Sequence, residues 1–200
     1  PSFIVTLGMM EIGRGGAHLL TQSQTLYIGA PIAWITETSV LGLSLPFLLA
    51  VGVVVAGQLV LSRTVFGRYM VAIGTNEEAV RLSGIDPRPI KITVFLLSGL
   101  LVALAAIIDT SRLGQAANPN AGNGFELQAI AAAVIGGTSL MGGRGSVVST
   151  FFGVLIIAVL NVGLAAVGAK DETKRLVTGF VIIAAVILDQ YRQRASRGKT

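Results

Sequence analysis

The sequence contains no cysteine, a single histidine and little charge. Without cysteine the chain has no disulfide and no thiolate metal site, and the lone His18 has no neighbouring ligands with which to build another kind of metal site. Asp, Glu, Lys and Arg make up 12% of the 200 residues, about half of the roughly 25% that is usual in soluble domains. The chain is therefore too poor in charge to cover a surface that faces water.

Apolar residues are abundant, at 52% of the chain, and the mean hydropathy is +0.76. An α-helix rises about 1.5 Å per residue, so about 20 apolar residues cross a hydrocarbon core of roughly 30 Å. Six segments approach that length, at residues 2–20, 42–61, 92–108, 125–141, 147–167 and 176–188. This pattern predicts an all-α, multi-pass membrane protein with about six transmembrane helices, in one domain.

The net charge of +5 reflects membrane topology rather than a nucleic-acid partner, because the basic residues are not gathered on one face. They lie in the gaps between apolar segments and in the tail, and cytoplasmic loops of membrane proteins are rich in Lys and Arg. With six spans, ten basic residues fall on one side and four on the other. The tail, with Arg192, Arg194, Arg197 and Lys199, and the loop 62–91 are therefore predicted to be cytoplasmic.

The loop 62–91 contains a short helix with its own end signals. Asn76 is a good N-cap, and Glu77 and Glu78 place negative charge at the positive end of the helix dipole. Gly84 suits the left-handed residue that closes a helix, and Pro87 prevents continuation. The helix is either an amphipathic segment resting on lipid headgroups or a coupling helix that docks into a partner and transmits its motion.

Several motifs, in order along the chain, resemble one family of transporters. Glu78-Ala79-Val80, followed three residues later by Gly84, resembles the Glu-Ala-Ala-x-x-x-Gly loop of ABC importer permeases, with Val80 replacing the second Ala. Residues 74–85 are similar to the ribose, xylose and arabinose permeases, and the likeness continues through residues 124–127, 129–132 and 136–145. It covers nearly the whole chain, which matches the latter portion of longer family members. Residues 1–200 are thus expected to be part of one transmembrane domain.

The resemblance implies a subunit that moves a monosaccharide across the bacterial inner membrane, not an enzyme. Its expected partners are a cytoplasmic ATPase, a periplasmic sugar-binding protein and a second permease copy, surrounded by lipid. ATP would be bound by the ATPase, so no cofactor is expected here, nor any catalytic residue or metal. The alternatives are an ABC permease for branched-chain amino acids or nucleosides, or an ion-driven secondary transporter. The residues expected to contact the ATPase are Asn76, Glu77, Glu78, Ala79, Arg81, Leu82, Ser83 and Gly84.

A second group of residues forms candidates for helix packing or for the transport path. The fourth apolar segment is rich in Ala and Gly, and small residues let helix backbones approach closely in a membrane. Packing is the preferred interpretation, and contact with substrate is the alternative. Related permeases usually carry Asp where this chain has Gln128, whose neutral amide can bond sugar hydroxyls but lacks the charge of an aspartate. The candidates are Gln128, Gly136, Gly137, Thr138, Ser139 and Asn161.

Overall fold

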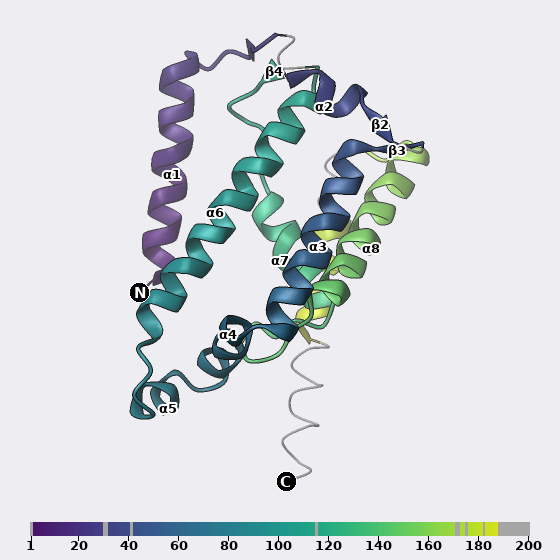
Figure 1. Ribbon diagram of the computed structural model, residues 1–200. Coiled ribbons are helices and arrows are strands. Elements are labelled where there is room, and N and C mark those ends of the chain that lie inside the picture. The colour runs from purple at the N-terminus through teal and green to yellow at the C-terminus, as the bar shows by residue number, and fades with distance from the viewer. Residues whose placement is uncertain are drawn as a thin grey trace. The chain divides into compact units, whose positions relative to one another are not determined.

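The computed structural model describes residues 2–29, 32–40, 42–114, 116–170, 173–174, 176–181 and 183–187. The chain divides into two compact units, one made of Pro1–Ala50 with Phe95–Asn123 and the other of Val51–Val94 with Gly124–Thr200. Helices dominate both (Figure 1). The predicted all-α class is confirmed, apart from four strands of two residues each in the described chain.

Each predicted apolar segment contains a helix, and three shorter helices lie between these segments. The helices are α1 (Ser2–Thr21), α2 (Trp34–Glu37), α3 (Leu45–Arg63), α4 (Val65–Thr75), α5 (Glu77–Leu82), α6 (Pro87–Arg112), α7 (Phe125–Ile135) and α8 (Val147–Ala166), with a further apolar helix at Leu176–Ile187. Proline stands at the first position of α6, where its missing N–H breaks no helical hydrogen bond.

Within the described residues, three helices are long and apolar enough to cross a membrane: α3, α6 and α8. None of the apolar window of α3 or α6 is buried inside the chain, and 11% of that of α8 is. Helices that are apolar all round with so little burial need lipid or another protein around them. The chain is thus a multi-pass membrane protein.

Helix α1 has the length of a span but contains a charged pair in its middle. Arg14 Nη1 lies 3.9 Å from Glu11 Oε1, one turn apart on the helix. Residues three apart lie on one face of a helix, so the opposite charges of Glu11 and Arg14 can pair there.

The predicted fourth span is a much shorter helix than the sequence suggests. Helix α7 ends at Ile135 because Gly136 begins a turn and Gly137 has a φ of +85°. Its 11 residues rise about 16 Å, roughly half of a hydrocarbon core. Ala131, Ala132 and Val134 of α7 are buried against other parts of the chain. A short helix continued by irregular backbone is tolerated in a membrane protein where protein surrounds it.

The first unit is closed by polar contacts near the ends of its helices. Strand β1 (Leu26–Tyr27) pairs antiparallel with β4 (Ala116–Ala117), and β2 (Ser39–Val40) with β3 (Leu43–Ser44). The buried Ser111 hydroxyl donates to the Ile32 carbonyl at 2.7 Å and lies 3.0 Å from the Thr36 hydroxyl. These bonds join α2 to the last turn of α6.

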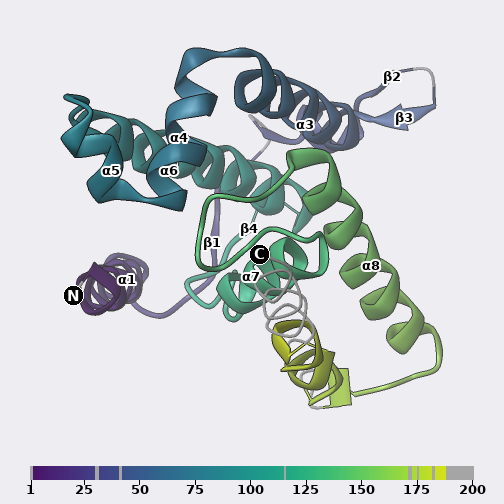
Figure 2. The same cartoon turned by 90° about the horizontal axis from the view of Figure 1, so that it is seen from below.

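The core of the second unit is the contact between α7 and α8, which lie side by side in two perpendicular views (Figures 1 and 2). Ala131, Ala132 and Ile157 form its buried cluster. Gly153 of α8 allows the close approach, because a side chain there would overlap the Ala132 carbonyl. Small residues at a helix interface bring two backbones into contact in this way.

The loop 62–91 and the tail differ in how far the structure describes them. The loop 62–91 contains a second helix, α4, in addition to the predicted short one. The four basic residues of the tail, on which part of the predicted orientation depends, lie outside the described residues, as does the end of the sixth apolar segment.

Candidate functional site

Helix α5 is capped at both ends as its sequence predicts. The Asn76 Oδ1 atom accepts from the Ala79 amide at 3.0 Å. At the other end, Gly84 has a φ of +86°, its amide donates to the Arg81 carbonyl, and the Ile85 amide donates to the Val80 carbonyl. These two bonds are the pattern of a Schellman motif, which satisfies the last carbonyls of a helix. A helix of six residues is thereby given defined ends.

The eight predicted contact residues of this loop are all exposed, while Val80 between them is buried. Leu82 is 80% exposed although it is apolar. Val80 is the buried residue of α5, whereas Glu78, Ala79, Leu82 and Ser83 are exposed. We call these four exposed residues the candidate docking surface, or docking surface for short.

Ion pairs fix the orientation of α5. Lys91 Nζ lies 2.6 Å from Glu77 Oε2, which joins the first turn of α5 to the first turns of α6. Arg81 Nη2 lies 2.9 Å from Glu78 Oε1 within α5 itself. All four side chains are about half exposed or more, so each pair adds little to overall stability. Their effect is to restrict where the short helix points.

The corner between α3 and α4 is tight. Thr64 caps α4 by accepting from the Gly67 amide at 3.1 Å. Gly67 is buried, and a Cβ atom there would overlap the carbonyl of Leu61 and lie 2.5 Å from that of Val60. The glycine is required because the first turn of α4 packs directly on the end of α3.

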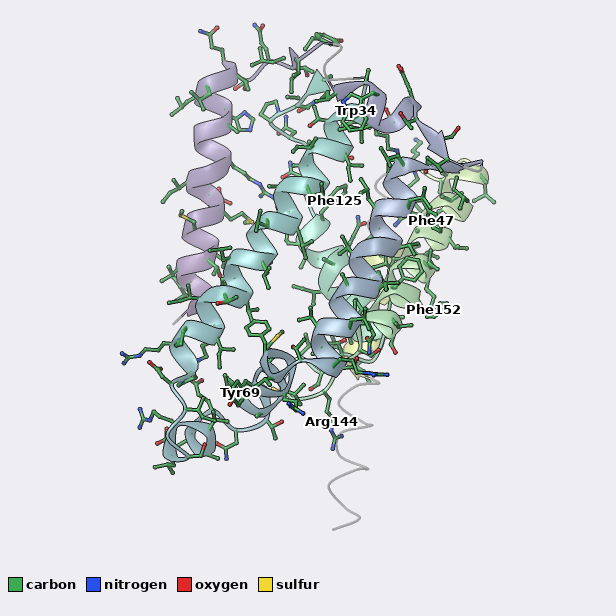
Figure 3. The ribbon with its side chains drawn as sticks, in the orientation of Figure 1. Trp34, Phe47, Tyr69, Phe125, Arg144 and Phe152 are labelled. Carbon is green, nitrogen blue, oxygen red and sulfur yellow. The ribbon has the colours of Figure 1, made fainter. Side chains whose placement is uncertain are left out.

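The far end of α4 contacts the 142–145 turn between α7 and α8. A Cβ atom at Gly74 would lie 2.5 Å from the Gly143 amide nitrogen, and one at Gly142 would lie 2.6 Å from the Gly74 carbonyl oxygen. Figure 3 shows Arg144 of this turn at the same end of the helices as Tyr69 of α4. Two loops that are far apart in the sequence therefore meet at the base of α5.

Gln58 of α3 holds the first turn of α8. Its Oε1 atom accepts from the amides of Val147 at 3.0 Å and Val148 at 3.3 Å, and from the Ser146 hydroxyl at 3.3 Å. The first amides of a helix have no partner within the helix. A side chain from another helix supplies it here.

Replacing Gln58 by Leu is expected to lower the free energy of unfolding by about 1–3 kcal/mol, because two helical amides lose their acceptor. Thermal unfolding of the detergent-solubilised protein measures this effect. Asn161→Leu is the matched control, since the Asn161 Nδ2 atom donates to the Ile157 carbonyl of its own helix at 3.0 Å. Equal destabilisation by the two substitutions would contradict the role assigned to Gln58.

The predicted packing or path residues fall into separate places. Gly136 packs on α8, where a Cβ atom would lie 2.5 Å from the Ser149 carbonyl oxygen, and the Thr138 hydroxyl lies 3.0 Å from that of Thr150. The Ser139 amide donates to the Arg144 carbonyl across the turn at 2.9 Å. By contrast, the half-buried Gln128 lies in the second turn of α7. The structure thus brings 136, 138 and 139 together near α8 and leaves 128 apart from them.

Asn161, the remaining candidate for helix packing or the transport path, lies in α8. Its amide bonds within α8, to the carbonyl one turn earlier. Among the residues that the structure describes, no three His, Asp or Glu side chains gather as they would around a metal ion.

Sequence reasoning missed several residues of this region, namely Gln58, Gly67, Gly74 and Thr150. A glutamine in an apolar span and two glycines within a short amphipathic helix were visible signals, because each is unfavourable without a specific contact. What they contact was not visible, since their partners lie far along the chain.

Comparison with known proteins shows extensive similarity. Residues 1–186 match the sequence family described as "Branched-chain amino acid transport system / permease component". The ribose import permease protein RbsC of Escherichia coli is 42% identical over 197 residues, which cover 96% of this chain and 61% of the relative. RbsC of Bacillus subtilis is 42% identical over 191 residues, covering 94% and 59%. The xylose transport system permease protein XylH of E. coli is 44% identical over 155 residues, covering 78% and 39%.

The chain therefore spans less than two thirds of the length of these curated relatives. No solved structure matches it at a comparable level of significance.

Proposed function

Because the chain belongs to the permease family of branched-chain amino acid transport systems, we propose that it forms part of the membrane subunit of an ATP-driven importer whose substrate is a monosaccharide. The substrate class follows the relatives, which are named ribose and xylose permeases and align with most of this chain. The role is that of a transport subunit, and ATP hydrolysis belongs to a partner.

The observation that carries the link to an ATPase is the docking surface on α5. A loop that only connects two spans needs no capped helix, no buried Val80 and no ion pair to the next helix. Here all three fix a short helix whose outer face exposes Leu82 and the Glu78 carboxylate. A fixed, preorganised element loses little entropy when a partner binds it. We propose that the partner is the cytoplasmic ATPase of the importer.

The orientation in the membrane is part of the proposal. The contact of Gly74 with Gly143 requires the loop 62–91 and the 142–145 turn to be on one side. Both carry Arg or Lys, which favours the cytoplasmic side. With an even number of crossings beyond the turn, the C-terminus is cytoplasmic too. The membrane is then the bacterial inner membrane.

Two further partners complete the proposed assembly. Helices α3 and α6 bury none of their apolar windows within this chain, so lipid and a second permease copy would cover them. A periplasmic sugar-binding protein would deliver the substrate to the opposite side of the membrane.

A second candidate substrate comes from the description of the family itself, which names branched-chain amino acids. The sugar-permease relatives argue against it, because identity at this level extends over nearly all of the chain. Both substrates are compatible with the same docking surface.

Uptake by the full-length protein, reconstituted with its ATPase and binding protein, separates these candidates. We expect ATP-dependent accumulation of labelled ribose or xylose, and no accumulation of labelled leucine. Leucine uptake alone would assign the second substrate. Uptake driven by an ion gradient without ATP would overturn the importer assignment.

A further inference from the structure

The contact between Gly74 of α4 and the 142–145 turn does more than allow a chain reversal. We propose that it is a rigid backbone joint through which movement of α5 reaches α7 and α8. The inference rests on the proposed function, in which α5 is moved by the ATPase. It assigns positioning roles to Gly74, Gly142 and Gly143, which lie outside the docking surface.

The joint is made by backbone on both sides. An added Cβ atom at Gly74 would lie 2.5 Å from the Gly143 nitrogen and 3.3 Å from its Cα atom. From the other side, a Cβ atom at Gly142 would lie 2.6 Å from the Gly74 oxygen, and one at Gly143 would overlap the Thr75 hydroxyl. Backbone cannot rotate away as a flexible side chain can, so neither segment can move toward the other without displacing it.

The joint is attached directly to α5. Asn76 ends α4, where its amide donates to the Ala72 carbonyl at 3.0 Å, and it also caps α5 through its side chain. Only Thr75 and Asn76 separate Gly74 from the first turn of α5. A displacement of α5 is therefore passed to Gly74 with little loss.

On its other side the joint is attached to α7 and α8. The turn is closed by the bonds of the Ser139 amide to the Arg144 carbonyl, at 2.9 Å, and of the Gly142 amide to the Ser139 carbonyl, at 3.2 Å. The Thr138 and Thr150 hydroxyls lie 3.0 Å apart at its base. These short links make the turn a stiff connection between the end of α7 and the start of α8.

The simpler explanation is that the glycines only permit a sharp reversal. It accounts for Gly142 and Gly143, whose φ values are +90° and +74°. It does not account for Gly74, which is inside helix α4, where alanine is the better helix former. A glycine is needed at position 74 because the 142–145 turn packs against it.

Gly74→Ala tests the joint because it should stabilise helix α4 and at the same time disturb the contact with the turn. Alanine favours helix α4, but its methyl group must push the turn away by about 1 Å to reach ordinary contact with the Gly143 nitrogen. In reconstituted vesicles with the ATPase and binding protein, we expect ATP-dependent ribose uptake to fall about tenfold. Binding of the ATPase should stay within twofold of the unmodified protein, since the docking surface is intact.

Gly163→Ala of α8 is the matched control. It is also a helical glycine, but a Cβ atom there has nothing within 4 Å, so uptake should be unchanged. Normal uptake by Gly74→Ala would overturn the joint while leaving the importer assignment standing. Absence of ATP-dependent sugar uptake by the unmodified protein would instead refute the function on which the joint rests.

A second variant covers the possibility that Gly74→Ala does not fold. Thr138→Cys with Thr150→Cys introduces one cysteine pair into a chain that has no other cysteine. The proposal holds this link to be rigid throughout the transport cycle, so oxidation to the disulfide should leave ribose uptake within twofold. Uptake that is lost on oxidation and restored by reduction would contradict it.

Discussion

Gly153→Val is expected to force α7 and α8 apart and to lower the free energy of unfolding by about 3 kcal/mol. Gly153 is buried, and its Cβ position overlaps the Ala132 carbonyl and lies 2.8 Å from the Gly136 nitrogen. Both neighbours are backbone atoms of α7, so no rotamer change relieves the overlap. Thermal unfolding of the solubilised protein should show a large fall in midpoint, and uptake should be lost with it.

The control for this substitution is on the same helix. Gly163→Ala meets nothing within 4 Å and replaces glycine by a better helix former, so its midpoint should stay the same or rise slightly. If Gly153→Val unfolds at the midpoint of the unmodified protein, the described packing of α7 on α8 is wrong.

Glu78→Arg is expected to weaken binding of the ATPase at least tenfold, about 1.4 kcal/mol, and to reduce uptake with it. The Glu78 side chain is 63% exposed on the docking surface, and reversing its charge places a cation where the partner would meet a carboxylate. Co-purification and binding titration with the ATPase measure the change. Recovery of the permease in the membrane should be unaffected, because the residue is outside the spans.

The reversal also removes the ion pair with Arg81, so a second variant is needed. Glu78→Arg with Arg81→Glu restores an ion pair at the same spacing of three residues. If the docking charge matters, the double variant remains defective in binding. Recovery of normal binding would show that Glu78 acts only by holding α5 together.

The sequence was most informative where the controlling interactions are local. The caps at Asn76 and Gly84 depend on residues within three positions of them, and the structure confirms both. The Glu11–Arg14 pair is local in the same sense. That the chain is a membrane protein follows from its composition alone, without knowledge of any contact.

The failures concern contacts between distant segments. The apolar run at 125–141 was predicted to span, but Gly137 in the left-handed region ends α7 early. The buried residues of this short helix are Ala131, Ala132 and Val134 near its end. Helix α4 was missed because Gly67 and Gly74 lower the helix propensity of its sequence. Gly67 packs against the end of α3, and Gly74 packs against Gly143, which is far along the chain. Gln58 was missed because the helix it caps begins 89 residues later.

The central claim is that the face of α5 with Leu82 binds the ATPase, and one accessibility measurement tests it directly. Because residues 1–200 contain no cysteine, Leu82→Cys provides the single thiol of this segment, at a position that is 80% exposed. We expect maleimide to label it rapidly in the permease alone and at least tenfold more slowly once the ATPase is bound, while labelling of Leu113→Cys, 51% exposed in the native protein, does not change. Equal labelling of Leu82→Cys with and without bound ATPase would contradict the assignment.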